Sequence, residues 1–154
     1  MEAQELTGYY TYRSFLDMPL PVDEFNKIRF AEAELFLNVR IDGSITGTLS
    51  FPADPGVVEK EFMDITGNVK NWSSPLTIEF TGRGRANTEI FDYMYEYSSS
   101  VAQTWDKGIN QRLALTGTVL RAQDHHGSGN QIAKAGQTAS FVGVKRDFAE
   151  PRDV

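Results

Sequence analysis

The chain has 154 residues, of which 40% are hydrophobic, and its formal net charge is −6. This length suits one globular domain with one core, so we expect a single domain over residues 1–154. The acidic balance argues against nucleic acid or an anionic membrane surface as a partner. The sequence has no cysteine, which excludes disulfides, zinc–thiolate sites and thiol nucleophiles.

The first residues, Met-Glu-Ala-Gln-Glu, are acidic and polar, unlike the basic and then apolar start of a secretory signal. No apolar run approaches the length of a membrane-spanning helix. We therefore expect a cytoplasmic protein that does not associate with membranes.

Alternation of apolar and polar residues with a period of two recurs along the chain, whereas helical periodicity is almost absent. Residues 31–41 alternate most clearly, and Asp42-Gly43 then supplies a tight turn into the next strand. We expect short helices at residues 22–28 and 99–107, and a mobile loop or lid at 123–137. The predicted strands are, in chain order, residues 5–12, 31–41, 44–51, 61–69, 76–82, 90–98, 111–122 and 138–146.

A tripeptide of an apolar residue, threonine and glycine repeats within these strands. The copies are Leu6-Thr7-Gly8, Ile45-Thr46-Gly47, Ile65-Thr66-Gly67, Phe80-Thr81-Gly82 and Leu115-Thr116-Gly117, with Phe141-Val142-Gly143 as a degenerate sixth. Alternation places the apolar residue and the glycine on the inner face and the threonine on the outer face. An inward glycine lets a strand coil sharply, which a small closed barrel requires. We therefore predict an all-β protein, an eight-stranded antiparallel up-and-down β-barrel.

These motifs resemble the avidin family of calycin-like barrels. Leu6-Thr7-Gly8-Tyr9-Tyr10 is similar to the opening strand of avidins, and Gly43-Ser44-Ile45-Thr46-Gly47-Thr48 is similar to their second strand. Residues 62–69, 109–118 and 140–143 resemble the third, seventh and last strands. The resemblance implies an eight-stranded barrel whose interior binds a small molecule.

The biotin-binding residues of that family are not retained. The first-strand Asn and Ser correspond to Tyr12 and the stretch around Phe15-Leu16, and the second-strand Tyr and Ser correspond to Leu49 and Phe51. Lys145 takes the place of the last-strand Asp, and Leu113 takes the place of the stacking Trp of the seventh strand. Because a site without its hydrogen-bonding partners binds its ligand poorly, we expect no useful affinity for biotin.

The repeat also predicts which side chains face the barrel interior. They describe an apolar, aromatic-rich cavity with a few polar tips, which suits a small hydrophobic molecule. The alternative is that the same side chains simply fill the barrel. The predicted ligand-binding residues are Tyr10, Tyr12, Leu49, Phe51, Phe80, Tyr93, Tyr95, Gln111, Leu113 and Lys145.

Residues 91–97 carry four aromatic rings, which we expect on one face of a strand. Tyrosine hydroxyls in a cavity can orient a carbonyl or act as weak acids, although a core or interface role is the plainer alternative. In Asp124-His125-His126, one histidine could act as a base at the barrel mouth, while solvated side chains are the ordinary outcome. Adjacent histidines point oppositely in a strand, so we expect no metal site. The catalytic candidates are Tyr93, Tyr95, Lys145 and His125.

Three functions fit this sequence. The first is a binding barrel for a largely apolar or aromatic ligand, without a cofactor. The second is a cofactor-independent cyclase or isomerase that acts on a hydrophobic metabolite inside the barrel. The third is an oligomeric structural or interaction module. In each case we expect a homo-oligomer, a dimer or a tetramer.

Overall fold

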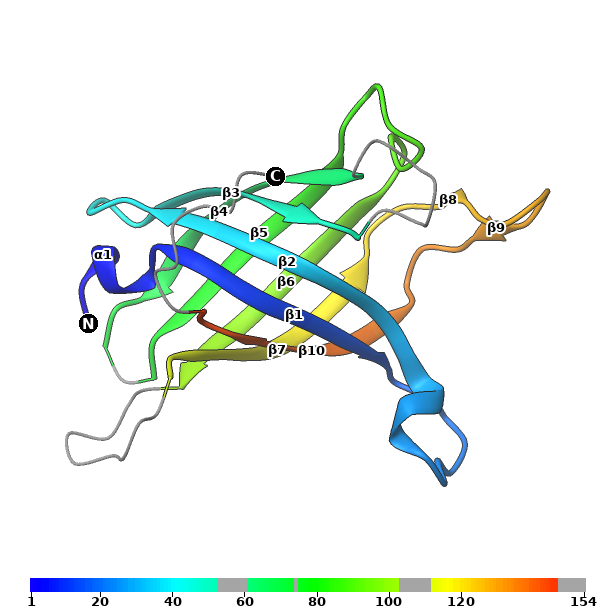
Figure 1. Cartoon of the computed structure of the whole chain (residues 1–154), viewed down its shortest axis with the longest axis horizontal. Helices are drawn as coiled ribbons and strands as arrows, with labels where there is room; N and C mark the ends of the chain where they lie inside the picture. The colour runs from blue at the N-terminus through cyan, green and yellow to red at the C-terminus, as the bar shows by residue number, and fades with distance from the viewer. Residues whose placement is uncertain (53–60, 74, 103–111, 147–154) are drawn as a thin grey trace.

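The computed structural model describes residues 1–52, 61–73, 75–102 and 112–146. Eight strands form a closed antiparallel barrel in which each strand pairs with the next along the chain and the last pairs with the first (Figure 1). This confirms the predicted eight-stranded up-and-down barrel. No helix in these residues is long and apolar enough to cross a membrane.

Each barrel strand overlaps one of the eight predicted strands. They are β1 (Gly8–Leu16), β2 (Arg29–Val39), β3 (Ser44–Ser50), β4 (Phe62–Asn71), β5 (Thr77–Gly84), β6 (Met94–Ala102), β7 (Ala114–Arg121) and β10 (Thr138–Val144). Outside the barrel lie the helix α1 (Ala3–Leu6), the 3-10 helix η1 (Phe25–Ile28) and a small hairpin of β8 (His125–His126) and β9 (Ile132–Ala133).

Several predicted boundaries were wrong. The first strand begins at Gly8, because the residues before it form α1. The sixth strand begins at Met94, because backbone hydrogen bonds fold residues 88–93 into turns. It then continues through residues 99–102, where we predicted a helix, because Ser99 and Val101 alternate inward; the rest of that predicted helix lies outside the described residues. The segment 123–137 contains the β8–β9 hairpin.

The apolar-Thr-Gly repeat sets the facing of the strands as predicted. Ile45, Ile65 and Leu115 are at most 1% exposed, and the threonine after each is on the outer face. The glycines of the same copies lie where a neighbouring strand approaches closely. A Cβ at Gly47 would lie 1.9 Å from the carbonyl oxygen of Phe36, which no side chain can occupy. The repeat therefore supplies both the barrel core and the space for strand coiling.

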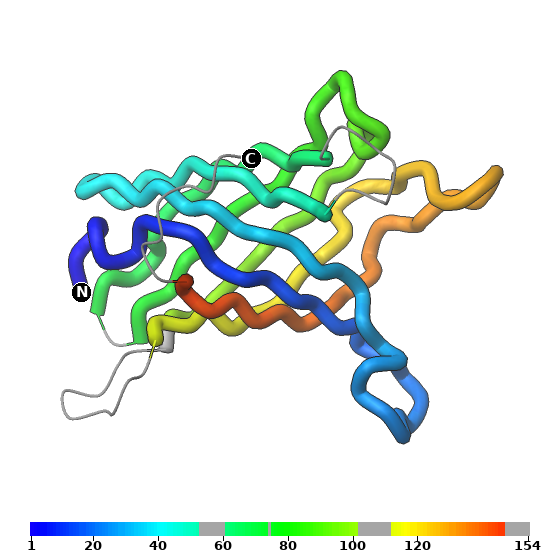
Figure 2. Tube along the Cα trace, in the orientation of Figure 1, coloured from blue at the N-terminus to red at the C-terminus, as the bar shows by residue number. Residues whose placement is uncertain are grey.

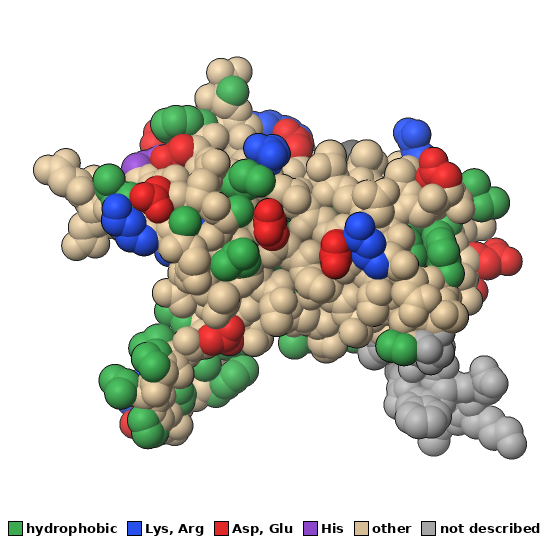
Figure 3. All heavy atoms as spheres, turned by 180° about the vertical axis from the view of Figure 1, so that it is seen from behind, with side chains coloured by type: hydrophobic (Ala, Val, Ile, Leu, Met, Phe, Trp, Pro, Cys, Tyr) green, Lys and Arg blue, Asp and Glu red, His purple; other side chains and the backbone are tan. Residues whose placement is uncertain are grey.

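One end of the barrel is closed by α1. Leu6 of this helix is 1% exposed within the core, and the Tyr10 hydroxyl donates to its carbonyl oxygen at 2.6 Å. The opposite end is surrounded by η1, the turns before β6 and the projecting β8–β9 hairpin (Figure 2). Seen from behind, the outer surface carries scattered charged side chains of both signs rather than a patch of one sign (Figure 3). The two ends of the barrel therefore differ, and the site described next lies at the open one.

Candidate functional site

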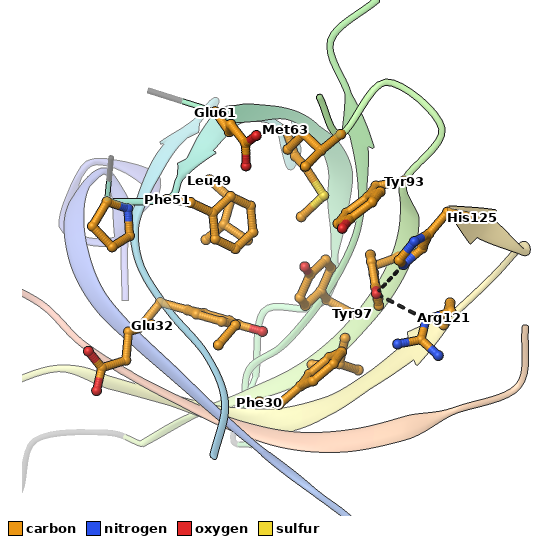
Figure 4. A pocket seen from close by; sticks show the side chains of 16 residues that line it. Phe30, Glu32, Leu49, Phe51, Glu61, Met63, Tyr93, Tyr97, Arg121 and His125 are labelled. Carbon is orange, nitrogen blue, oxygen red and sulfur yellow. Dashed lines mark hydrogen bonds between the residues drawn. The ribbon is translucent and has the colours of Figure 1, made fainter. Parts of the chain in front are cut away.

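A cavity of about 450 Å³ occupies the open end of the barrel (Figure 4). We call it the cup. Most of its walls are aromatic or aliphatic, and its polar groups gather at the rim. The cup is lined by Tyr12, Phe30, Ala31, Glu32, Leu49, Phe51, Pro52, Glu61, Met63, Ile90, Tyr93, Tyr95, Tyr97, Val119, Arg121 and His125.

The floor of the cup is a packed group of rings from four strands. Tyr97 stacks on Phe80 with ring centroids 4.7 Å apart, and Tyr12 stacks on Phe141 at 5.5 Å. Tyr12 and Tyr97 meet edge to face at 6.2 Å. Burial of these rings closes the barrel beneath the cup, so the interior is neither an open tube nor completely filled.

Three polar side chains meet on one side of the cup. The Tyr95 hydroxyl lies 2.8 Å from Nε2 of His125, and Nε of Arg121 donates to the same hydroxyl at 3.1 Å (Figure 4). The Tyr93 ring stacks on the His125 imidazole with centroids 3.7 Å apart. We call Tyr95, Arg121 and His125 the polar cluster. It places a phenol, a cation and an imidazole beside an apolar wall.

The hydrogen bonds assign the tautomer of His125. Its Nδ1 lies 2.8 Å from the backbone carbonyl oxygen of His126, which can only accept, so Nδ1 carries a hydrogen. In neutral imidazole Nε2 is then an acceptor, and Tyr95 donates its hydroxyl hydrogen to it. The Tyr95 oxygen accepts from Arg121 and retains a lone pair. With neutral His125, Tyr95 therefore faces the cup as an acceptor.

Asp92 positions His125 by binding the adjacent residue, His126. The Asp92 carboxylate accepts from the backbone N–H of His126 and from its Nδ1, both at 2.8 Å. Although desolvation opposes the shift, these bonds lower the pKa of Asp92. Gln123 also donates to the Asp92 carbonyl oxygen at 2.7 Å. These contacts tie the β8–β9 hairpin to the turn before β6 and hold His125 at the rim.

Burial keeps the tyrosines of the cup protonated. It raises the pKa of Tyr12 to about 12 and raises the pKa of Tyr97 well above its ordinary value. Burial also raises the pKa of Tyr95, and the hydrogen bond and charge of Arg121 partly offset this. The cup therefore presents neutral phenols at neutral pH.

The structure brings together half of the predicted site residues. Of the predicted ligand-binding residues, Tyr12, Leu49, Phe51, Tyr93 and Tyr95 line the cup. Of the catalytic candidates, Tyr93, Tyr95 and His125 are in contact with one another. His125, for which a solvated position was the ordinary expectation, is 6% exposed, because its ring stacks on Tyr93 and Asp92 holds the backbone of the adjacent His126.

Of the other predicted ligand-binding residues, four do not line the cup and one lies outside the described residues. Tyr10 and Phe80 are core residues below the cup, and Leu113 packs on the core at the closed end. Lys145 also lies at the closed end, where its Nζ donates to the carbonyl oxygen of Glu5 in the α1 helix. Lys145 directly follows β10, which runs from the open end of the barrel to the closed end, so position 145 lies at the closed end. Gln111 is the residue outside the described part.

The ring face predicted over residues 91–97 is interrupted. Phe91 is 58% exposed and stacks on His126, because it precedes β6 and lies in a turn. Within the strand, Tyr95 and Tyr97 do face inward as alternation requires. Arg121 is not among the residues predicted from the sequence, although stepping by two from Leu115 along β7 reaches it on the inner face. Phe30, Glu61 and Ile90 belong to strand ends and turns, where alternation gives no signal.

The fold and the cup define the class as a closed antiparallel barrel with an apolar cavity at one end. No protein-family model, curated protein or solved structure matches the chain. The avidin-like relationship therefore stays a prediction, and function is argued below from the cup itself.

Proposed function

We propose that the protein is a small-molecule-binding barrel that encloses a largely apolar or aromatic ligand other than biotin. The cup supports this, because a cavity of about 450 Å³ with apolar walls and a few convergent polar groups is typical of ligand sites. Burial of roughly 200–300 Å² of apolar ligand surface would contribute about 5–8 kcal/mol. Association costs several kcal/mol, so we expect micromolar affinity.

A fluorescence titration with the neutral probe N-phenylnaphthylamine tests this proposal. Ala31→Trp fills the cup, and Thr116→Trp adds the same bulk on the outer face of β7 as a matched control. We expect the wild type and Thr116→Trp to bind the probe alike and Ala31→Trp to bind at least about tenfold more weakly. Circular dichroism verifies that both variants fold. Equal binding by all three proteins would place the probe outside the cup and contradict the proposal.

A second candidate function is a cofactor-independent isomerase or cyclase. The 2.8 Å contact between Tyr95 and His125 favours it, because a phenol bonded to an imidazole can move a proton beside an apolar substrate. Deuterium exchange from heavy water into tetralone, an apolar ketone with an acidic C–H, tests this activity. Acceleration that disappears in His125→Gln supports an enzyme. Exchange at the uncatalysed rate, with the ketone shown to bind, supports a binding protein.

The homo-oligomer, a dimer or tetramer, and the cytoplasmic location also remain proposals. They rest on the sequence alone. Native mass spectrometry of the purified protein reports the oligomeric state together with any small molecule that co-purifies.

A further inference from the structure

Arg121 is a partly buried cation with no acidic partner among the described residues. Its Nε donates to Tyr95 and its Nη1 donates to the backbone oxygen of Lys134, both at 3.1 Å. Its Cζ lies 5.7 Å from the centroid of the Phe30 ring. By contrast, Arg85, which directly follows β5, pairs with Asp64 at 2.9 Å. A guanidinium has five N–H groups, so Arg121 keeps donors that no described residue accepts from.

The two acids that line the cup do not neutralise Arg121. Glu32 is paired with Arg13 at 2.9 Å and with Arg29 at 2.8 Å, and it points away from the cavity (Figure 4). Glu61 lies on the other side of the cup, near Met63 and across from Arg121 (Figure 4). The rim is therefore positive beside β7 and negative beside β4. A ligand with one anionic group would be oriented by this difference.

We propose that the ligand is an organic acid, a carboxylate or phenolate with an aromatic or aliphatic body, whose anionic oxygens lie against Arg121. The inference rests on the proposed binding function and names its ligand class. A planar guanidinium suits a carboxylate because two N–H groups can donate to two oxygens. The apolar walls and the ring floor then cover the body of the acid.

The bonds of Tyr95 determine where the anion can lie. Its hydroxyl donates to Nε2 of His125 and accepts from Nε of Arg121, so it has no hydrogen left to donate to an anion. The anionic oxygens therefore lie against the remaining N–H groups of Arg121.

Calorimetric titration with naphthoate and with naphthamide, its neutral counterpart, tests the proposal. We expect the acid to bind about tenfold or more tightly than the amide. Arg121→Met should lower the affinity for the acid by roughly ten- to a hundredfold and leave the affinity for the amide within about twofold of the wild-type value. Arg83→Met removes the same charge from the outer face of β5 and should change neither affinity. The measured quantity is the ratio of the affinities for acid and amide. A general loss of stability in Arg121→Met would lower both affinities and would not change this ratio.

One further variant completes the test. Glu61→Gln should strengthen acid binding, since it removes a negative charge from the cup. Equal affinity for naphthoate and naphthamide would overturn the acid assignment and leave the binding function intact. Binding of N-phenylnaphthylamine without binding of naphthoate would have the same meaning. Failure of naphthoate, naphthamide and N-phenylnaphthylamine to bind would overturn both the acid assignment and the binding function.

Discussion

The Tyr95 hydroxyl and Nε2 of His125 lie 2.8 Å apart although 30 residues separate them in the chain. β6 pairs with the next strand, β7, and the segment after β7 then returns His125 over the rim. Arg121 completes the arrangement by donating to the same hydroxyl. This contact joins the hairpin at the mouth to the wall of the cup, and its removal should affect both stability and ligand choice.

Replacement of Tyr95 by Phe should lower the free energy of unfolding by about 1–3 kcal/mol, because a buried imidazole nitrogen and Arg121 both lose a partner. Tyr93→Phe is the matched control. Its hydroxyl makes no hydrogen bond to the described residues, so we expect a change within about 0.5 kcal/mol. Urea unfolding followed by fluorescence measures both values. Equal losses in the two variants would show that the Tyr95 hydrogen bonds do not stabilise the fold.

Stability should fall at alkaline pH. The pKa of Tyr12 is about 12 in the fold and about 10 in the unfolded chain, so between these values the unfolded chain loses the proton first. The stabilisation is complete below about pH 10 and is lost as pH rises toward about 12, and it amounts to about 3 kcal/mol for this group. Urea unfolding at several pH values should show a smaller alkaline loss in Tyr12→Phe. An unchanged pH dependence in that variant would contradict the burial of the hydroxyl as the cause.

The repeated glycines should differ sharply in their tolerance of alanine. At Gly117 a Cβ would lie 1.9 Å from the carbonyl oxygen of Ser98, so Gly117→Ala should cost several kcal/mol or prevent folding. At Gly82 the nearest atoms belong to the side chains of Ile65, Met63 and Tyr97, all at 3.3 Å, and none belongs to the backbone, so we expect a far smaller loss. Thermal unfolding compares the two. Similar losses would mean that close strand approach is not what requires glycine in the repeat.

Replacement of Lys145 by Met should leave ligand binding unchanged. The lysine lies at the closed end and bonds to Glu5 of α1, away from the cup. We expect the affinity for N-phenylnaphthylamine to stay within about twofold of the wild type. A large loss of affinity would indicate that the closed end also takes part in binding.

Much of the fold was readable from the sequence because one local rule applies along every strand. The apolar-Thr-Gly repeat fixed the facing of residues such as Ile65 and Leu115, and the same alternation extends to Arg121. The rest depended on contacts between distant segments. The position of His125 depends on the hydrogen bonds that its neighbour His126 makes to Asp92 in another turn, and the position of Lys145 depends on which end of the barrel each strand reaches. The alternation of residues within one strand predicts neither of these two positions.

A crystal structure of the protein with bromonaphthoate would test the central claim, ligand binding in the cup, most directly. The anomalous signal of bromine locates the ligand without assumption. We expect bromine within the cup, near the ring floor of Tyr12 and Tyr97, and the carboxylate against Arg121. Bromine on the outer face of the barrel, or a cup closed by its own side chains with no ligand, would contradict the claim.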